Sequence, residues 1–537
     1  MSFLFAAETA SQGVPLFPLV VTGLFFFAIL AIAAWGMTKT KNVDDFFLGG
    51  HLLGPWILAI SYGAAYFSAV IFIGFAGTYG WQCSFKSLWI GIGNAVVGGL
   101  LAWLVLGKQT RKMTRRLGAS TMPEFFKERY GSHRMKCFGA VAIFIFLLPY
   151  SAGVFGGLTY LFQAVFHIDM KVALTVITAI TGVYLVLGGY KAAARIDFLQ
   201  GMIMFVGAIA MVMLVWRYFA VQTGGYGVAV ADAINAFKAR GAIAETPVAE
   251  GGLGGKPVSN LLFWSVVFMS SIATWGMPQM VQKYYAIKDE NQIVKGSVVC
   301  FVFALVIGVA AYSIGSFSHL MSPEQLQGTL NPQGQIDVNR LVPTMLVDAF
   351  TNCSWFLAIV LLLVLSASMS TLCSLALTSA SALSIDFFKG YAAPNAKDKT
   401  NLLVFRVSCA LFVLGSYLIA FFQPSWIVAL TSLTWGVVAG AFLAPYVYGL
   451  FWKGTTKAGA IAGMATGLVV SNALYWGLFF GQSPAAAKMY SPIVASIAMI
   501  LPFFVVPPVS WMTKKLDPEL VKKAFEDPSE EEVKAEA

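Results

Sequence analysis

The segment Ser366–Lys389, with the sequence SASMSTLCSLALTSASALSIDFFK, combines an apolar composition with hydroxyl side chains near its start. It is long enough to cross a bilayer as a helix. Helical residues three and four positions apart share a face, so Ala367 lies over Ser370 and Thr371. The Ala367 carbonyl and the two hydroxyls can then face one small volume, where uncharged oxygens could replace the water around an alkali cation. Alternatively, such hydroxyls bond to their own helix or join neighbouring helices.

The whole chain has the composition of an integral membrane protein. Of its 537 residues, 58% are hydrophobic and 11% are charged, and many windows exceed the roughly 18 apolar residues that mark a membrane helix. The net charge of +10 comes from basic residues in short loops, which favours a role in membrane topology over a nucleic-acid partner. The six cysteines and four histidines are scattered, so the sequence predicts neither a disulfide framework nor a zinc or haem site.

Thirteen apolar spans can be drawn along the sequence. They run near residues 14–37, 54–80, 84–107, 137–166, 172–187, 198–220, 260–283, 296–320, 345–389, 402–422, 426–451, 458–480 and 491–511. An odd number of spans places the two termini on opposite sides of the membrane. With the N-terminus outside, most of the 35 lysines and arginines fall on the inner side, as the positive-inside rule requires. We therefore expect an external N-terminus and a cytoplasmic C-terminus.

Two of these spans are poor continuous helices. The run Ser61–Ser68 (SYGAAYFS) places glycine, small residues and hydroxyls near the middle of the second span. The run Ser270–Pro278 (SSIATWGMP) does the same in the seventh span, and its proline removes a helix donor. Backbone groups freed in this way are tolerated in lipid only where they line a cavity or find other partners. Broken helices at matching positions in two halves indicate an inverted-repeat transporter, although kinked helices rich in small residues also serve close packing.

The predicted fold class is therefore an all-α polytopic membrane protein with about 13 transmembrane helices, an inverted repeat of five plus five helices, and two broken helices. We expect four parts along the chain. They are an extra N-terminal transmembrane helix and loop (1–53), the ten-helix transport core (54–451), two C-terminal transmembrane helices (452–511) and a charged cytoplasmic tail (512–537).

Several short motifs occur in order along the chain. They are Ala64–Ala69 with Phe72–Gly74, Gly188 and Gly189 with Asp197 and Gln200, Gly276–Pro278 with Lys288 and Asp289, Met369–Thr371 with Asp386–Lys389, and Gly459 and Ala460 with Gly463 and Gly467. Together they resemble the sodium/solute symporter family, from about Asp44 to about Trp511, and especially its pantothenate and proline symporter branch. The resemblance implies a LeuT-like core.

The resemblance also implies a sodium site. Its ligands would be backbone carbonyls from the second span and the ninth span, together with two hydroxyls from the ninth. The carbonyls belong to Ala64, Phe67 and Ala367, and the hydroxyls to Ser370 and Thr371. This set agrees with the helical-face argument above, and hard cations prefer oxygen ligands.

Asp197 resembles a family acidic residue that is tied to sodium coupling, in some members through a second ion. Alternatively, it is a charge at the cytoplasmic edge that pairs with Lys191 or Arg195. Both interpretations stay open at this point.

The solute pocket is expected to have apolar walls and a few polar groups. The candidates are Tyr66, Ser68, Tyr150, Ser270, Ser271, Thr274 and Trp275. Trp275 could stack on the solute or gate it, or pack in the bundle core. Tyr66 stands where the proline symporter carries an aspartate, and Ser270 where it carries a substrate tryptophan. Such a pocket suits a small, partly apolar organic acid or amino acid better than a hexose.

The sequence thus predicts a sodium-coupled symporter of the cytoplasmic membrane that imports a monocarboxylate, a pantothenate-like solute or an amino acid such as proline. Its expected partners are Na+, the solute and the bilayer, with no nucleic acid and no obligatory protein partner. No grouping of nucleophile and base suggests an enzyme. A proton-coupled carrier would need a titratable group at mid-membrane, and Asp197 and Asp348 are expected near span ends. A channel or sensor would need a polar pore ring or a large soluble domain.

Overall fold

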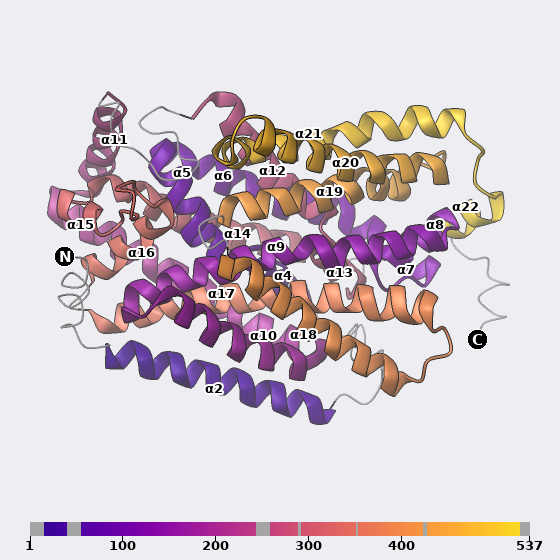
Figure 1. Ribbon diagram of the computed structural model, residues 1–537, viewed down its shortest axis with the longest axis horizontal. Coiled ribbons are helices and arrows are strands. Elements are labelled where there is room, and N and C mark those ends of the chain that lie inside the picture. Colours follow the sequence, from indigo (N-terminus) through magenta and orange to yellow (C-terminus); the bar gives the residue numbers. More distant parts are fainter. Residues whose placement is uncertain are drawn as a thin grey trace.

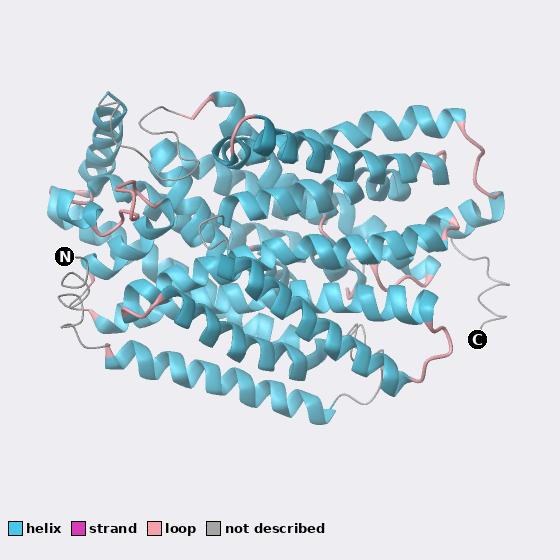
Figure 2. Ribbon diagram, in the orientation of Figure 1, coloured by secondary structure: helices cyan, strands magenta, loops and turns pink. Residues whose placement is uncertain are grey.

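Apolar helices run side by side along the long axis of the molecule (Figure 1). The computed structural model describes residues 15–39, 55–242, 258–287, 292–350, 353–422 and 427–526. Within those ranges the regular secondary structure is helical (Figure 2), apart from one isolated bridge between Leu330 and Ile336. An all-helical fold satisfies the backbone groups inside each helix within their own segment, which the interior of a bilayer demands.

The helices of the first half, in chain order, are α2 Leu16–Lys39, α4 Pro55–Tyr66, η3 Val70–Phe75, α5 Ala76–Cys83, η4 Ser84–Ser87, α6 Leu88–Gly93, η5 Asn94–Leu101, η6 Trp103–Gly107, α7 Lys108–Leu117, α8 Met122–Tyr130, α9 His133–Phe166, α10 Met170–Thr223 and α11 Tyr226–Ala242. Those of the second half are α12 Asn260–Gly276, α13 Pro278–Tyr285, α14 Ile293–Phe317, η8 Ser318–Leu320, α15 Pro323–Gln327, α16 Val338–Ala349, α17 Ser354–Ser381, η9 Ala382–Ala392, α18 Asp398–Phe422, α19 Ile427–Phe451, α20 Lys457–Gly481, α21 Pro484–Met512 and α22 Pro518–Phe525.

Ten helical stretches in the described ranges are long and apolar enough to cross a membrane, or 11 if the bent pair α12 and α13 is one span. The multi-span helical class is confirmed, but this count is lower than the predicted 13. Two apolar helices, Trp56–Tyr66 and Met170–Val186, are shorter than the others. The stretch Val70–Leu117 is counted as one span. At Ser84, whose φ of 48° interrupts the helical backbone, η4 follows α5 directly, without a loop between them.

The sequence suggested a loop between spans 172–187 and 198–220, and the structure corrects this. The backbone is helical without interruption from Met170 to Thr223 in α10. The connecting residues Lys191–Arg195 (KAAAR) are strong helix formers. Their helix propensity favours a continuous helix between the two apolar runs.

The segment that opened the sequence argument lies at the centre of the bundle. In the span formed by α17 and η9, 89% of the most apolar window is buried, against 33% for α2 and for α18. Helices α2, α4, α9, α10 and α18 all pack against α17. A helix that is apolar on every side belongs in such a central position, and its serines and alanines let neighbouring backbones approach closely.

Both predicted helix breaks are confirmed. In the second span, α4 ends at Tyr66, Phe67 and Ser68 are not helical, and the π-helix η3 begins at Val70. In the seventh span, α12 and α13 meet at Met277 with a bend of 45°. Pro278 is the first residue of α13, where its missing donor costs no helical hydrogen bond.

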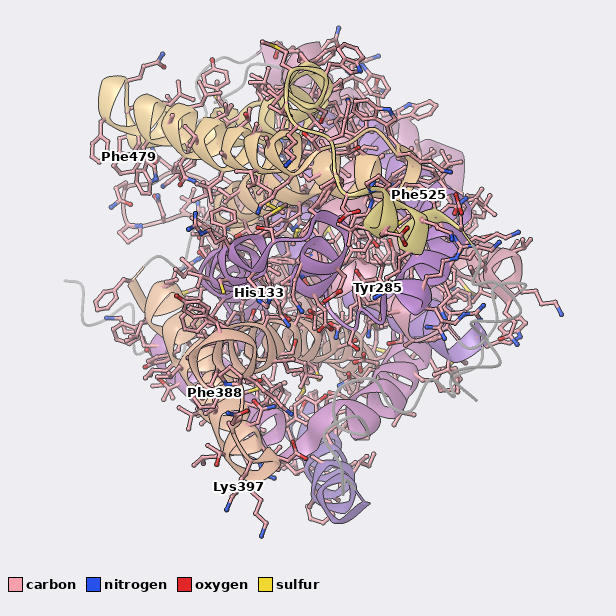
Figure 3. The ribbon with its side chains drawn as sticks, turned by 90° about the vertical axis from the view of Figure 1, so that its right-hand side faces the viewer. His133, Tyr285, Phe388, Lys397, Phe479 and Phe525 are labelled. Atoms are coloured by element: carbon pink, nitrogen blue, oxygen red, sulfur yellow. The ribbon has the colours of Figure 1, made fainter. Side chains whose placement is uncertain are left out.

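The two ends of the molecule differ in charge. Figure 1 shows α11, α15 and α16 at one end and α7, α8 and α22 at the other. The second end is basic, because the ten residues of α7 have the sequence KQTRKMTRRL. Figure 3 looks onto this end, where α9 begins at His133, α13 ends at Tyr285 and α22 carries Phe525.

Candidate functional site

The break after α4 leaves backbone carbonyls without helical partners. The last four carbonyls of any helix lack an internal donor and carry the negative end of its dipole. Beyond the break, hydroxyls take the place of helical acceptors. The Ala69 amide donates to Ser368 Oγ at 3.1 Å, and the Val70 amide donates to Ser68 Oγ at 3.2 Å. The hydroxyls of Ser68 and Ser368 therefore stabilise the break. The carbonyls at the end of α4 remain available to other partners.

Those carbonyls converge on one hydroxyl of α17. Thr371 Oγ1 lies 3.1 Å from the carbonyl oxygens of Phe67 and Ala367, 3.2 Å from that of Ala65 and 3.4 Å from that of Ala64. All five residues are at most 1% exposed. A hydroxyl has a single proton, so it donates fully to only one of the four oxygens. The result is a buried cluster with more acceptors than donors, which a small cation would satisfy.

Four of the five predicted sodium ligands meet in this cluster, and the fifth, Ser370, does not. Ala64, Phe67, Ala367 and Thr371 meet as expected, and the carbonyl of Ala65 joins them. Ala65 was missed because the resemblance pointed only to Ala64 and Phe67, whereas every carbonyl in the last turn of a helix is available.

Ser370, the neighbour of Thr371, turns to a different group. Its hydroxyl donates to Asp197 Oδ1 at 2.9 Å. The other carboxylate oxygen, Oδ2, accepts a hydrogen bond from Ser61 at 3.0 Å and lies 3.0 Å from Lys283 Nζ. Lys283 also donates to Ser61 Oγ at 2.8 Å. These four side chains join α17, α10, α4 and α13 in one buried polar cluster, which we call the Asp197 cluster.

Asp197 is buried beside a cation that the sequence analysis did not name. It is 2% exposed, and the cation beside it is Lys283, which is 5% exposed. The side chains of Lys191 and Arg195 lie outside the described part of the chain. Sequence reasoning missed Lys283 because 86 residues separate it from Asp197 along the chain. Lys283 does, however, follow the helix break by only a few residues. A lysine so close to a break in an apolar span was the signal.

A small cavity lies next to the break that follows α4. Its lining is mostly apolar and aromatic, with a few hydroxyls and one amide. The lining residues are Tyr66, Phe67, Ser68, Val70, Ile71, Phe75, Asn94, Tyr150, Ser270, Tyr312 and Trp435. Phe67 belongs to both places: it lines the cavity, and its carbonyl faces Thr371. The cavity and the carbonyl cluster therefore share a wall.

The polar groups of this lining are held by bonds between α4, α12 and η5. The Tyr66 hydroxyl donates to the Ser270 carbonyl at 2.6 Å. The Ser270 and Ser271 hydroxyls both donate to Asn94 Oδ1, at 2.8 Å and 3.3 Å. Asn94 was not predicted, although a single amide in an otherwise apolar span was a usable signal. On the facing side, Trp435 contacts Tyr150 edge to face with ring centroids 5.7 Å apart.

Three of the predicted solute residues are absent from the described lining. Ser271, Thr274 and Trp275 instead connect α12 to η5: Thr274 donates to the Gly98 carbonyl at 3.2 Å, and Trp275 Nε1 donates to the Val97 carbonyl at 3.0 Å. Tyr66, Ser68, Tyr150 and Ser270 do line the cavity. The distinction follows from helix geometry, since successive residues of α12 point to different sides and only one face meets the cavity.

The comparison with known families decides the class of protein. Residues 46–467 match the model of the Sodium:solute symporter family. The chain belongs to this family. It is a sodium-coupled solute symporter in a membrane, and not an enzyme. The resemblance drawn from the motifs is confirmed.

Relatives of this symporter are proline transporters. It is 28% identical over 463 residues to a sodium/proline symporter of Haemophilus influenzae, covering 84% of this chain and 86% of the relative. It is 27% identical to the high-affinity proline transporter PutP of Bacillus subtilis, covering 87% and 95% of the two chains. The corresponding values for sodium/proline symporter 2 of Staphylococcus saprophyticus are 28%, 92% and 94%.

Solved transporters share the fold of this symporter. A Na+-coupled sialic acid symporter, determined in a substrate-bound outward-open state, matches with a TM-score of 0.70 and 16% identity over 93% of this chain and 99% of its own. The nucleobase-cation-symport transporter Mhp1 matches with a TM-score of 0.50 and 14% identity over 90% and 99%. These likenesses establish the LeuT-like fold that the family resemblance implied.

Proposed function

We propose that this symporter carries a small, partly apolar solute, such as proline or a short monocarboxylate, together with one Na+ bound where α4 breaks against α17. The observation that carries the proposal is the convergence of four carbonyl oxygens on Thr371 Oγ1. The adjoining cavity supplies a place for the solute. Transport would proceed by alternating access between the two sides of the membrane.

The oxygen cluster suits Na+ in its chemistry. The ligands are the carbonyls of Ala64, Ala65, Phe67 and Ala367 and the hydroxyl of Thr371, with Ser370 beside it on the same helix. Hard cations prefer oxygen, and carbonyls replace the hydration shell of an alkali ion. The oxygens are uncharged, so they can bind the ion without preventing its release.

The cavity favours a small solute. The space in it that admits a water-sized sphere is only about 20 Å³, well below the roughly 300–1,000 Å³ that is usual for ligand pockets. Among the described lining residues there is no charged side chain. A buried net charge without a partner is costly, so a zwitterion, or an acid whose charge the sodium ion balances, is preferred. The names of the relatives support proline as the first candidate.

Sodium and solute would be coupled through the end of α4. Tyr66 and Phe67 form part of the cavity wall, and the Phe67 carbonyl faces the sodium cluster. An ion that fixes this turn against α17 also fixes the cavity wall, so each ligand would tighten the other by the same factor. Inward movement of one positive charge gains about 2.3 kcal/mol per 100 mV of negative interior potential.

The proposed orientation follows from charge. The basic end formed by α7 and α8, with the C-terminal helix α22, would face the cytoplasm, and the start of α2 would face outward. Import from the outside then follows the sodium gradient. The proposed division is an extra helix, a ten-helix core, two C-terminal helices and a tail; residues 40–54 and 527–537 lie outside the described ranges.

Uptake of radiolabelled proline into proteoliposomes tests this function. An inward Na+ gradient should drive accumulation, and an equal K+ gradient should not. Short monocarboxylates and pantothenate, added as unlabelled competitors, rank the solute classes, and a true solute should raise the unfolding temperature more in Na+ than in K+. Accumulation driven by a pH gradient without Na+ would contradict sodium coupling.

A further inference from the structure

The carboxylate of Asp197 has partners on both of its oxygens. Oδ1 accepts from Ser370, and Oδ2 accepts from Ser61 and from Lys283, all within 3.0 Å. Each of the four residues is at most 5% exposed. A buried carboxylate needs hydrogen bonds and a positive charge nearby. In a sodium symporter that charge can be a mobile ion or a fixed side chain.

Lys283 supplies the fixed charge. Its ammonium lies 3.0 Å from Asp197 Oδ2 and 2.8 Å from Ser61 Oγ. A carboxylate oxygen and a hydroxyl oxygen are the ligands that a second Na+ at this carboxylate would use. The ammonium therefore takes up the same oxygens and balances the same charge. A sodium ion added there would bring a second positive charge beside the first at low local dielectric, where repulsion is strong.

We propose that Lys283 is a tethered substitute for a second cation, so that this symporter binds one Na+ per cycle and Asp197 acts on it only through Ser370. The proposal rests on the sodium site proposed above. It assigns Asp197 as a positioning residue rather than an ion ligand. The Ser370 hydroxyl gives its proton to Asp197, so its oxygen lone pairs are free to face away from the carboxylate. Partners of this kind orient a ligand and raise its basicity.

The ion pair also connects the two broken spans. Lys283 lies in α13, beyond the bend of the seventh span, while Ser61 lies in α4, before the break of the second. Asp197 adds α10, and Ser370 adds α17. The Asp197 cluster thus joins both broken helices to the helix that carries Thr371, through bonds that need no ion.

Counting bound ions tests the proposal directly. Binding of ²²Na+ to the purified full-length protein in detergent should saturate at one ion per chain. In Lys283→Gln the uncompensated Asp197 should recruit a second ion, whereas Lys283→Arg should still bind one. In Asp197→Asn/Lys283→Gln, which removes both charges and so avoids an unpaired buried carboxylate, the count should return to one. A wild-type count of two, or a count of one in folded Lys283→Gln, would overturn the inference.

The positioning role has its own readout. Asp197→Asn/Lys283→Gln should weaken binding of the single Na+ by roughly tenfold, the lower end of the effect of such partners. In a Ser370→Ala background the same double change should have almost no further effect, because Asp197 acts through that hydroxyl. Equal losses with and without Ser370 would overturn this role. A wild-type protein that binds no Na+ would contradict the sodium site itself, whereas two bound ions would contradict only the inference drawn from Lys283.

Discussion

Two neighbouring residues of α17 face opposite kinds of surroundings. Thr371 has four carbonyl oxygens within 3.4 Å of its hydroxyl and one proton to offer them. Ser370 faces a carboxylate whose charge is already matched by Lys283 at 3.0 Å. Around Thr371 the carbonyl oxygens outnumber the donors, but none of these groups is charged. Around Ser370 the Asp197 carboxylate is charged, but Lys283 already balances that charge. The comparison teaches that a cation site is found where acceptors outnumber donors, and not simply where an acidic residue lies.

Substitutions in the Asp197 cluster should have the largest effect, which is on the free energy of unfolding. Lys283→Met leaves the Asp197 carboxylate buried and uncompensated, and breaking a buried pair in this way costs about 3–5 kcal/mol of unfolding free energy. Asp197→Asn/Lys283→Met removes both charges and should recover most of the loss. Thermal unfolding of the detergent-solubilised protein in K+ buffer measures both. Equal destabilisation by the single and double variants would show that the charge balance is unimportant.

Substitution of Thr371, at the centre of the carbonyl cluster, should lower the affinity for sodium. Thr371→Ala removes the oxygen at the centre of the carbonyl cluster, and we expect a loss of about 2 kcal/mol, or roughly 30-fold, in Na+ binding. Thr371→Ser keeps the hydroxyl and is the matched control, so it should stay within a few-fold of the wild type. The sodium concentration for half-maximal uptake is the measurement. An alanine variant with unchanged sodium dependence would exclude Thr371 as a ligand.

Substitutions of Asn94 test whether the cavity lining can be changed without affecting sodium binding. Asn94→Leu removes the acceptor of the Ser270 and Ser271 hydroxyls, which costs about 1–3 kcal/mol if the hydroxyls stay unpaired. We expect the KM for the solute to rise several-fold while the number of bound sodium ions stays the same. Asn94→Asp keeps an acceptor for both hydroxyls and tests whether the acceptor or the amide matters. A variant with unchanged solute KM would show that Asn94 is only structural.

A second carboxylate, at the end of the molecule opposite to the basic one, predicts the smallest effect. Asp337 caps α16, accepts from Tyr160 at 3.0 Å and has Arg340 at 3.6 Å, and burial raises the pKa of its carboxyl above the usual value. The folded state then binds the proton more tightly than the unfolded state, so stability should fall as the pH rises from the ordinary aspartate pKa through the raised one. Asp337→Asn keeps the cap and should flatten this slope in thermal unfolding as the pH rises above the ordinary aspartate pKa of about 4. An unchanged slope would assign the dependence to other groups.

Local features of the site were readable from the sequence. The spacing of Ala367 and Thr371 placed them on one face, and the small and hydroxyl residues of Ser61–Ser68 indicated the break whose carbonyls now surround Thr371. Ser370, expected on the same face, instead turns to Asp197. These features depend on helix periodicity and on backbone chemistry within a few residues. The same is true of Pro278, which begins α13 as expected.

Features that depend on distant contacts were not readable. Asp197 finds its cation 86 residues away, and Asn94 meets Ser270 across 176 residues. No local pattern states which faces of two helices will meet. Likewise Ser271, Thr274 and Trp275 had suitable chemistry for a solute pocket, yet their face of α12 packs on η5. Residue type restricts what a side chain can do, and packing decides which partner it has.

The central claim is that uncharged oxygens at the break in α4 hold the transported sodium ion. A structure determined experimentally at high resolution in saturating Na+, with a matched data set in K+, tests it most directly. The account predicts a sodium-dependent peak among Thr371 Oγ1 and the carbonyl oxygens of Ala64, Phe67 and Ala367, with none beside Asp197. A peak at Asp197 in place of Lys283 Nζ, or an apolar side chain filling the space next to Thr371, would contradict it.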